Sequence, residues 1–344
     1  LTPQQKIIHT LSEMIVKAQK PIRILDAIKW NSEVQDYFFR HKFRRLPEID
    51  ARFYEKNPLP FNPTEKIEEF YDIEREIHKH LGQFSGIGKI MMRMCREYRE
   101  AVRMLQARGT SEFTKISQEL YGSSEDAFYA GAPSISDLAN ILSGALANIK
   151  NNLHTEIDEK KYSSEDAVKI LKSRLGEHFN DPEEPVLAKI DDGIIADAAA
   201  GAEMIKLRRG AQFSERDLKI LEVHEGWVHV GTTLNGKAQP VCTFLSKGPP
   251  SSTIFQEGLA VIVEIFSFVS HPSRIKRLTN RIAAVQKAEQ GADFIDIFNY
   301  FREQNLSEEE SYMHTTRVFR GSTPTGGPFT KDLAYNKGFI LIYN

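Results

Sequence analysis

Two histidines five residues apart, His224 and His229, constrain the local fold of this chain more than any other feature. Glu225 directly follows the first of them, in the stretch His-Glu-Gly-Trp-Val-His. Side chains five apart on a regular α-helix diverge by about 140°, whereas a separation of four leaves them only about 40° apart. A π-bulge, with its wider i to i+5 hydrogen bonds, realigns such residues and occurs mostly at functional sites. The spacing therefore predicts a π-bulge if both rings serve one ligand, and Gly226 would ease that distortion.

A second short segment supplies an acid that completes the pair of histidines. Glu257 lies in the stretch Gln-Glu-Gly-Leu-Ala, residues 256–260. Two imidazoles and a carboxylate make the ligand set of a hydrolytic zinc site, where Glu225 would act on water. Thr253 and Gln256 form a capping-box pattern, which predicts a helix with Glu257 in its first turn. These patterns indicate a zinc-dependent peptidase, although manganese or iron would also fit the same donors.

Other interpretations of the same residues need no catalysis. Two helical histidines can simply form hydrogen bonds in the core or at the surface, and the spacing alone favours neither interpretation. The helix dipole alone would favour Glu257 near a helix start. The alternative to an enzyme is a non-catalytic regulatory or binding protein that retains the fold and its metal.

The charge balance and the cysteine count limit which partners and which cellular compartment we expect. The 45 Lys and Arg residues nearly balance the 47 Asp and Glu residues, so no global field attracts nucleic acid or an anionic membrane. Cys95 and Cys242 are too few for a disulfide framework, and there is neither a secretory signal nor a long apolar run. We therefore expect a cytoplasmic protein. Because the chain begins at Leu1 and stops inside an apolar run, we also expect it to be a piece of a longer one.

The distribution of apolar residues predicts an α+β fold in which helices dominate. A charged segment with two prolines, residues 180–185, predicts a junction between a helical region, 1–180, and a metal-binding region, 181–344. Ser214 and Asp217 form a capping box, so the motif helix should begin near Glu215. Residues 186–190 and 204–208 alternate as strands do, which predicts a small sheet beside the motif. Earlier helices are predicted at 3–19, 63–81, 86–108, 112–121, 136–151 and 163–179.

The two motifs, together with residues 317–321 (Arg-Val-Phe-Arg-Gly) and 326–332 (Gly-Gly-Pro-Phe-Thr-Lys-Asp), carry a family resemblance. This part of the chain resembles the flavohaemoglobin expression-modulating QEGLA-motif proteins, which are related to the microtubule-associated tyrosine carboxypeptidases. The resemblance covers about residue 186 to the C-terminus, while the first half is similar only in its helical character.

The resemblance implies a zincin-like zinc peptidase. His224, His229 and Glu257 would hold Zn²⁺, and Glu225 would be the general base. The implied substrate is the C-terminal tail of a peptide or protein, with carboxypeptidase action. Residues within the His-Glu stretch differ from those of the eukaryotic relatives, so we carry over the reaction class and not the substrate.

Further residues are candidates for contact with a substrate. The oxyanion of the reaction needs a donor besides the metal, and a terminal carboxylate suits the planar fork of an arginine. The arginines beside Gly321 could equally bind loop carbonyls, and the basic run 274–277 with Arg281 is expected to be mainly a solvated helix face. The candidate oxyanion donors are Tyr312, His314 and Tyr335, and the candidate carboxylate ligands are Arg317, Arg320 and Lys331.

Overall fold

Helices form most of the structure, and a small sheet lies beside the motif helix, so the predicted α+β class is confirmed. The computed structural model describes residues 1–150, 158–179, 186–192, 194, 197–201 and 204–344. The elements are α1 (Pro3–Gln19), α2 (Ile24–Ala27), α3 (Ser32–Arg40), α4 (Ala51–Glu55), α5 (Pro63–Leu81), α6 (Gly86–Gln106), α7 (Ser111–Tyr121), α8 (Ile135–Lys150), β1 (Tyr162–Ser163), α9 (Ser164–Gly176), β2 (Leu187–Asp191), β3 (Ala198–Ala200), β4 (Met204–Arg208), β5 (Gln212–Phe213), α10 (Glu215–Leu221), η1 (Glu222–Val230), α11 (Gly231–Lys237), η2 (Thr243–Ser246), α12 (Pro250–Phe266), α13 (Pro272–Glu289), α14 (Phe294–Glu303), α15 (Glu308–Phe319), η3 (Thr330–Leu333) and α16 (Ala334–Tyr343).

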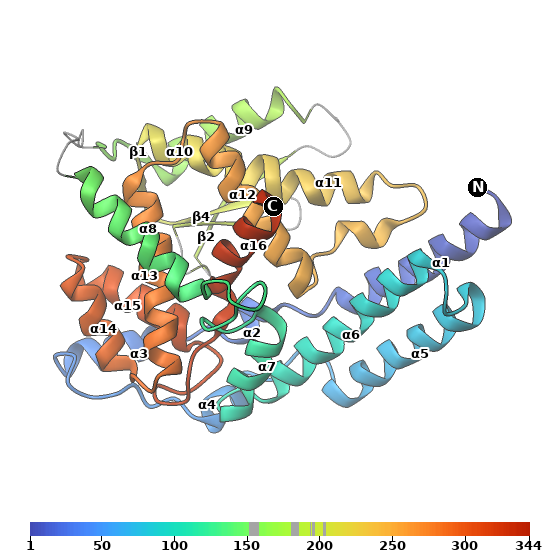
Figure 1. Ribbon diagram of the computed structural model, residues 1–344, viewed down its shortest axis with the longest axis horizontal. Helices are drawn as coiled ribbons and strands as arrows, with labels where there is room; N and C mark the ends of the chain where they lie inside the picture. Colours follow the sequence, from blue (N-terminus) through green and yellow to red (C-terminus); the bar gives the residue numbers. More distant parts are fainter. Residues whose placement is uncertain (151–157, 180–185, 193, 195–196, 202–203) are drawn as a thin grey trace.

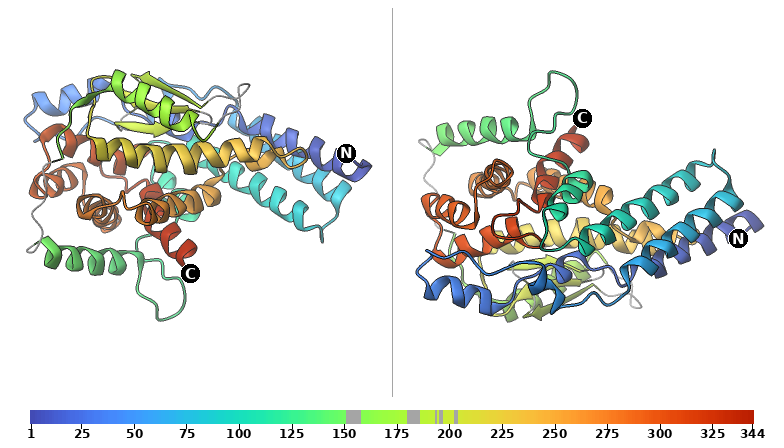
Figure 2. Two further views of the ribbon diagram at one scale, coloured as in Figure 1. Left: turned by 90° about the horizontal axis from the view of Figure 1, so that it is seen from above. Right: turned by 90° about the horizontal axis from the view of Figure 1, so that it is seen from below.

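The first helices form an elongated arm. Figure 1 shows α1, α5 and α6 projecting from the rest of the molecule, with the N-terminus near the tip of the arm. In the views of Figure 2 the arm keeps this shape. The three helices are amphipathic, and their apolar stripes face one another to bury Ile15, Phe70, Ile77 and Val102 completely.

A three-stranded sheet lies against the motif helix. Its order is β2-β4-β3, with β2 parallel and β3 antiparallel to the central strand β4. Strands β3 and β4 contact η1, and Ile205 and Leu207 of β4 are fully buried in a cluster with α9. β2 and β4 confirm the two predicted strands, whereas β1, β3 and β5 were not predicted because each is only two or three residues long.

The hydrophobic core does not divide at residue 180. Each of the four apolar clusters in the described residues combines side chains from both sides of that position. The largest joins the arm to Phe244, Ile254 and Phe329. The connector 180–185 itself lies outside the described residues. The core therefore crosses the predicted boundary between the two regions.

Helix ends follow their capping residues. Ser214 and Asp217 form the predicted capping box, and α10 begins at Glu215 as expected. The predicted box at Thr253 and Gln256 is wrong, because α12 begins earlier, at Pro250. Proline is favoured in the first turn of a helix, where its missing N–H costs nothing, and this preference sets the start. No helix in the described parts of the chain has the length and apolarity needed to cross a membrane.

Candidate metal centre

The motif helix is a π-helix over the whole stretch that holds the two histidines. η1 runs from Glu222 to Val230 between α10 and α11, which confirms the predicted distortion and extends it beyond one turn. The rings of His224 and His229 lie 5.1 Å apart between centroids, with an angle of 65° between their planes. The wider turn therefore brings both rings to the same side of the helix, where they can serve one ligand.

Glu257 completes a three-donor group with these rings. Its Oε2 lies 3.3 Å from Nε2 of His224 and 3.5 Å from Nε2 of His229. One ligand atom from each residue lies within 4.8 Å of the other two, and the group could hold a metal ion. His224 and Glu257 are buried, and His229 is partly exposed. The structure thus brings together all three predicted ligands.

The position of Glu257 differs from the prediction and has a different cause. Because α12 begins at Pro250, Glu257 lies in the middle of this helix and not in its first turn. Glycine at 258 lets the backbones of α12 and α16 come into direct contact. A Cβ at this position would lie 2.0 Å from the carbonyl carbon of Gly338. Figure 1 shows the two helices side by side. The helix crossing therefore fixes Glu257 and brings α16 to the metal centre.

Gly226 has a packing role. A Cβ at this position would lie 2.5 Å from Cδ2 of Leu175, which belongs to α9. The glycine therefore admits the fully buried Leu175 against η1. This contact accounts for the residue without the predicted easing of the helix distortion.

Each histidine is held by a partner on α12 through its other ring nitrogen. Nδ1 of His224 lies 2.6 Å from Oε1 of Glu264, and Nδ1 of His229 lies 3.0 Å from Oε1 of Gln256. Arg274 of α13 donates two hydrogen bonds to Glu264, one to each carboxylate oxygen, at 2.9 and 3.1 Å. Such partners fix the ring orientation of metal-binding histidines and leave Nε2 directed at the ion.

The group is strongly charged. Burial opposes ionisation of Glu257, but Lys331, whose Nζ lies 3.0 Å from Oε1, and the two histidines keep its pKa well below the usual range. Burial also opposes protonation of His224, yet hydrogen bonds to Glu257 and Glu264 raise its pKa to about 9. Without a metal, a proton therefore occupies the site, and a cation that binds there must displace it.

Two further candidates lie beside the three donors. Glu225, the predicted base, follows His224 on η1 and influences the charge state of both histidines. The ring of Tyr335, from α16, lies 6.1 Å from the ring of His224 between centroids. Burial raises the pKa of the Tyr335 phenol, as does the nearby Glu257, so the hydroxyl keeps its proton and can donate it in a hydrogen bond. Of the three predicted oxyanion donors, Tyr335 is the one with a ring contact to a candidate metal ligand.

The other two predicted oxyanion donors face the aromatic core. Tyr312 packs against Phe38, Phe39 and Phe294, and its exposed fraction is 5%. The ring of His314 stacks on Phe301 at 5.1 Å. Both side chains take this direction from α15, whose apolar face covers the aromatic cluster. No ring contact of Tyr312 or His314 among the described residues reaches the three-donor group, so their role as oxyanion donors stays a prediction.

The predicted carboxylate ligands are already engaged to different degrees. Arg317 donates from Nη2 and Nε to the two oxygens of Asp332, at 2.7 and 3.1 Å, so this edge of its fork holds an internal acid. Lys331 contacts Glu257. Arg320 is 6% exposed, its guanidinium carbon lies 5.5 Å from the centre of the Phe329 ring, and its Nε has no hydrogen bond within the described structure.

Sequence reasoning missed the residues that support the ligands. Glu264 is fully buried, and Arg274 is an ion-pair partner and not part of a solvated face as expected. One signal was available: Glu257 and Glu264 are seven residues apart, so on a regular helix they share a face. The pairing of that face with Arg274 requires the tertiary structure.

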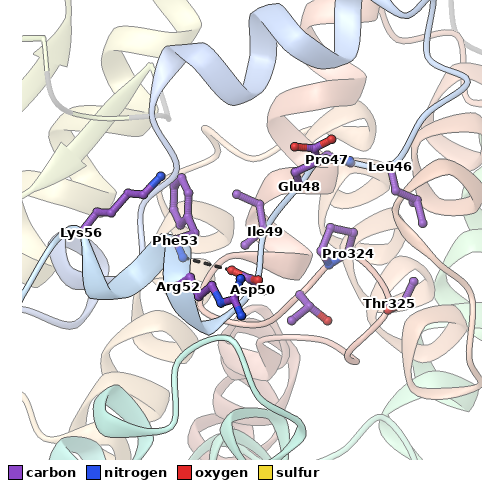
Figure 3. Close-up of a pocket in the computed structure, with 11 residues that line it drawn as sticks. Leu46, Pro47, Glu48, Ile49, Asp50, Arg52, Phe53, Lys56, Pro324 and Thr325 are labelled. Carbon is purple, nitrogen blue, oxygen red and sulfur yellow. Dashed lines mark hydrogen bonds between the residues drawn. The ribbon is translucent and has the colours of Figure 1, made fainter.

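A hollow of the surface lies apart from the three-donor group. A pocket of about 450 Å³ is lined by residues 46–50, 52, 53 and 56 together with 323–325 (Figure 3). In the close-up, Asp50 caps the short helix α4 through the backbone N–H of Phe53. No member of the three-donor group lines this pocket, so it is not part of the candidate centre.

The fold and the donor group define a predominantly helical α+β protein with a candidate metal centre built on a π-helix. A family model described as microtubule-associated tyrosine carboxypeptidase matches residues 36–344, and the chain belongs to this family. The match reaches far into the first half, beyond the resemblance noted from about residue 186. Relation to the QEGLA-motif proteins stays a prediction. The comparison with curated proteins finds no match.

Proposed function

We propose that this protein is a zinc-dependent carboxypeptidase that acts on the C-terminus of a peptide or protein. The single observation that carries the proposal is the convergence of two imidazole Nε2 atoms and one carboxylate oxygen. Two nitrogens and an oxygen are the donors of many catalytic zinc sites, which keep a further position open. Membership of a carboxypeptidase family supports the reaction class.

The donor group fits zinc in its chemistry. His224 and His229 each use Nδ1 for a protein partner, which leaves Nε2 for the ion. Glu257 is ionised and buried. When bound, Zn²⁺ supplies a Lewis acid that polarises a peptide carbonyl and lowers the pKa of water.

The residues around the three donors have separate roles in the reaction. Glu225 accepts a proton from the attacking water and passes it to the amine that leaves when the C–N bond breaks. Tyr335 donates a hydrogen bond to the carbonyl oxygen, which becomes an oxyanion when water adds to the carbonyl carbon. Lys331 holds Glu257 through Oε1, so that Oε2 stays directed at the histidines. Arg320 remains a candidate for the substrate carboxylate, because its Nε is unpaired in the described structure.

The experiment combines metal analysis with peptide cleavage. Protein is purified without added metal and then reconstituted with Zn²⁺. It should contain one zinc ion per chain, measured by inductively coupled plasma mass spectrometry. It should release single C-terminal residues from a panel of peptides. Glu225→Gln should retain the zinc and lower kcat by about 100-fold or more, the usual range for a lost general base.

The matched control is Glu222→Gln. This residue lies on the same π-helix and has the same side chain, but it forms its ion pair with Arg174. Its replacement should leave cleavage within about twofold of the wild type, because its ion pair with Arg174 involves none of the three donors. Stoichiometric zinc without cleavage of any peptide would favour the non-catalytic alternative. Failure to bind zinc after reconstitution would exclude the proposal.

A further inference from the structure

Three cations near the candidate metal centre form ion pairs with acids. These buried or partly buried pairs involve helices α12, α13 and α15 and the short helix η3. Each cation in such a pair is neutralised locally, which offsets the loss of its hydration. The pairs are Arg274 with Glu264, Arg317 with Asp332, and Lys331 with Glu257.

Two arginines in the same neighbourhood are exceptions. Arg281 of α13 and Arg320, which follows α15, form no ion pair among the described residues. The Nε atom of each is buried and has no hydrogen-bond partner there. Arg320 is 6% exposed, and Arg281 is partly exposed. A buried N–H donor without an acceptor is uncommon in folded proteins, and a bound water or ligand is one explanation for it.

Electrostatics agrees with the geometry. Burial, followed by repulsion from Arg317, lowers the pKa of Arg281 and that of Arg320 to about 10. Asp332 acts in the opposite direction on both, but this carboxylate is already engaged by Arg317. These named side chains together therefore carry more positive than negative charge, and an anion would relieve the imbalance.

The Tyr335 ring lies between the Arg281 guanidinium and the ring of His224. The guanidinium carbon of Arg281 is 5.7 Å from the centre of the Tyr335 ring, and that ring is 6.1 Å from the ring of His224. Arg281 and Tyr335 are both partly exposed, so a ligand from solvent can reach them. A carboxylate on the last residue of a peptide is only a few atoms from the peptide bond to be cleaved.

We propose that Arg281 binds the terminal carboxylate of the substrate, with Arg320 adding a second positive charge behind it. This inference rests on the proposed function and names a specificity-determining residue for it. The planar guanidinium matches a carboxylate with two parallel hydrogen bonds, and Arg281 has donors available because its Nε is unused. The predicted ligand Arg317 holds Asp332 in that way and so maintains the site.

The experiment separates binding from cleavage. Zinc-loaded protein carrying Glu225→Gln is titrated by calorimetry with acetylated tripeptides that differ in their last residue. Each tripeptide is supplied as the free acid and as the carboxamide. The best-binding acids should exceed their carboxamides in affinity by about 10- to 100-fold, the range for a hydrogen-bonded charge pair. Adding Arg281→Gln should remove this preference, and Arg281→Lys should retain part of it.

A matched control tests for a simple effect of net charge. Lys287→Gln removes one positive charge from the exposed part of the same helix and should leave the acid preference unchanged. If Arg281→Gln does not fold, Arg281→Lys serves as the test, because it retains the charge and should show a reduced preference for acids over carboxamides. Equal affinity for acids and carboxamides, or an unchanged preference in both Arg281 variants, would overturn the inference.

The outcomes also distinguish this inference from the proposed function. A preference for acids that depends on Arg281, in a protein whose wild type cleaves no peptide, would support the binding site and refute catalysis. Cleavage that depends on Glu225 but is insensitive to Arg281 would do the reverse. In an active enzyme, Arg281→Gln should raise KM for free-acid peptides by about 10-fold or more.

Discussion

Two regions in the interior of this molecule have opposite chemistry. The aromatic cluster, made by Trp30, Phe38, Phe294, Phe298 and Phe301, joins α3 to α14 and α15. The polar network surrounds the metal centre and consists of His224, His229, Gln256, Glu257, Glu264, Arg274 and Lys331. In the cluster Phe38 and Phe294 each contact several other rings, whereas in the network each polar atom depends on one or two named partners.

This difference determines how each region responds to change. Phe38 meets Phe294 and Phe298 edge to face, with centroids 5.1 Å away in both cases. The stability from such packing grows with the apolar area that is buried, and neighbouring rings can relax partly after a loss. The network has little apolar area, so its contribution is to hold donors in place. We therefore expect the cluster to control stability and the network to control function.

The largest effect should follow loss of a ring from the aromatic cluster. Phe38 is fully buried, and Phe38→Ala should lower the free energy of unfolding by about 3–5 kcal/mol. Urea denaturation measures this change. Zinc stoichiometry of the folded fraction should not change, because no contact of Phe38 reaches the donor group.

Phe84→Ala is the control for that substitution. Phe84 is 83% exposed, so the same truncation should change stability by no more than about 0.5 kcal/mol. If Phe38→Ala abolished zinc binding in protein that remained folded, the separation between the two regions would be wrong.

The second largest effect on stability is expected at the crossing of α12 and α16, which also positions Glu257 and Tyr335. Gly258→Ala would place a Cβ 2.0 Å from the backbone of Gly338, which cannot turn aside as a side chain can. Overpacking of this kind costs about 1–3 kcal/mol, and we expect the upper part of that range. Because α16 must shift with Tyr335, kcat/KM for a peptide should fall as well.

Gly226→Ala is the matched comparison for this glycine. It would meet the flexible end of Leu175, which can rotate, so its effect on stability should be smaller. Equal effects of the two glycine substitutions, measured by urea denaturation, would refute the role given to the crossing.

These two glycines illustrate what could be predicted from sequence. The π-helix was predictable, because the spacing of His224 and His229 is a local property of the chain. The three candidate ligands were named from that spacing, from the acid at 257 and from the family resemblance, and the structure brings them together. Crossings such as that of Gly258 with Gly338, and the ion pair between Glu264 and Arg274, join segments whose contact depends on the whole fold. The start of α12 was misjudged because Pro250 competes with a side-chain cap at Thr253.

A smaller effect, on zinc affinity, is expected when one hydrogen-bond partner of a histidine in the polar network is removed. Gln256→Met removes the oxygen that holds Nδ1 of His229 and leaves no buried charge unpaired. Zinc affinity should fall by about 10-fold, or about 1.4 kcal/mol, as for other partners of metal-binding histidines. Competition with a chelator measures this change. Ser252→Ala removes the other hydrogen bond of Gln256 and should have a weaker effect.

The smallest effect should appear at His314, which lies between the two regions. Its ring stacks on Phe301 of the aromatic cluster, while Arg281, Arg317 and Asp332 influence its charge. Burial, and then the two arginines, lower its pKa to about 3, well below the value of about 6.5 for an unfolded chain. The neutral ring is therefore favoured by folding.

The sign of the pH dependence follows directly. Between pH 6.5 and about 3 the unfolded chain binds a proton that the folded protein does not, so stability is lost as the pH falls below 6.5. His314→Gln cannot titrate, so the stability advantage of the wild type over this variant should shrink by about 1 kcal/mol between pH 7.5 and 5.5. Urea denaturation of the two metal-free proteins at both pH values measures the difference, and groups that titrate equally in both cancel. A constant difference would mean that water or an anion reaches His314 and that the boundary between the dry cluster and the charged network lies elsewhere.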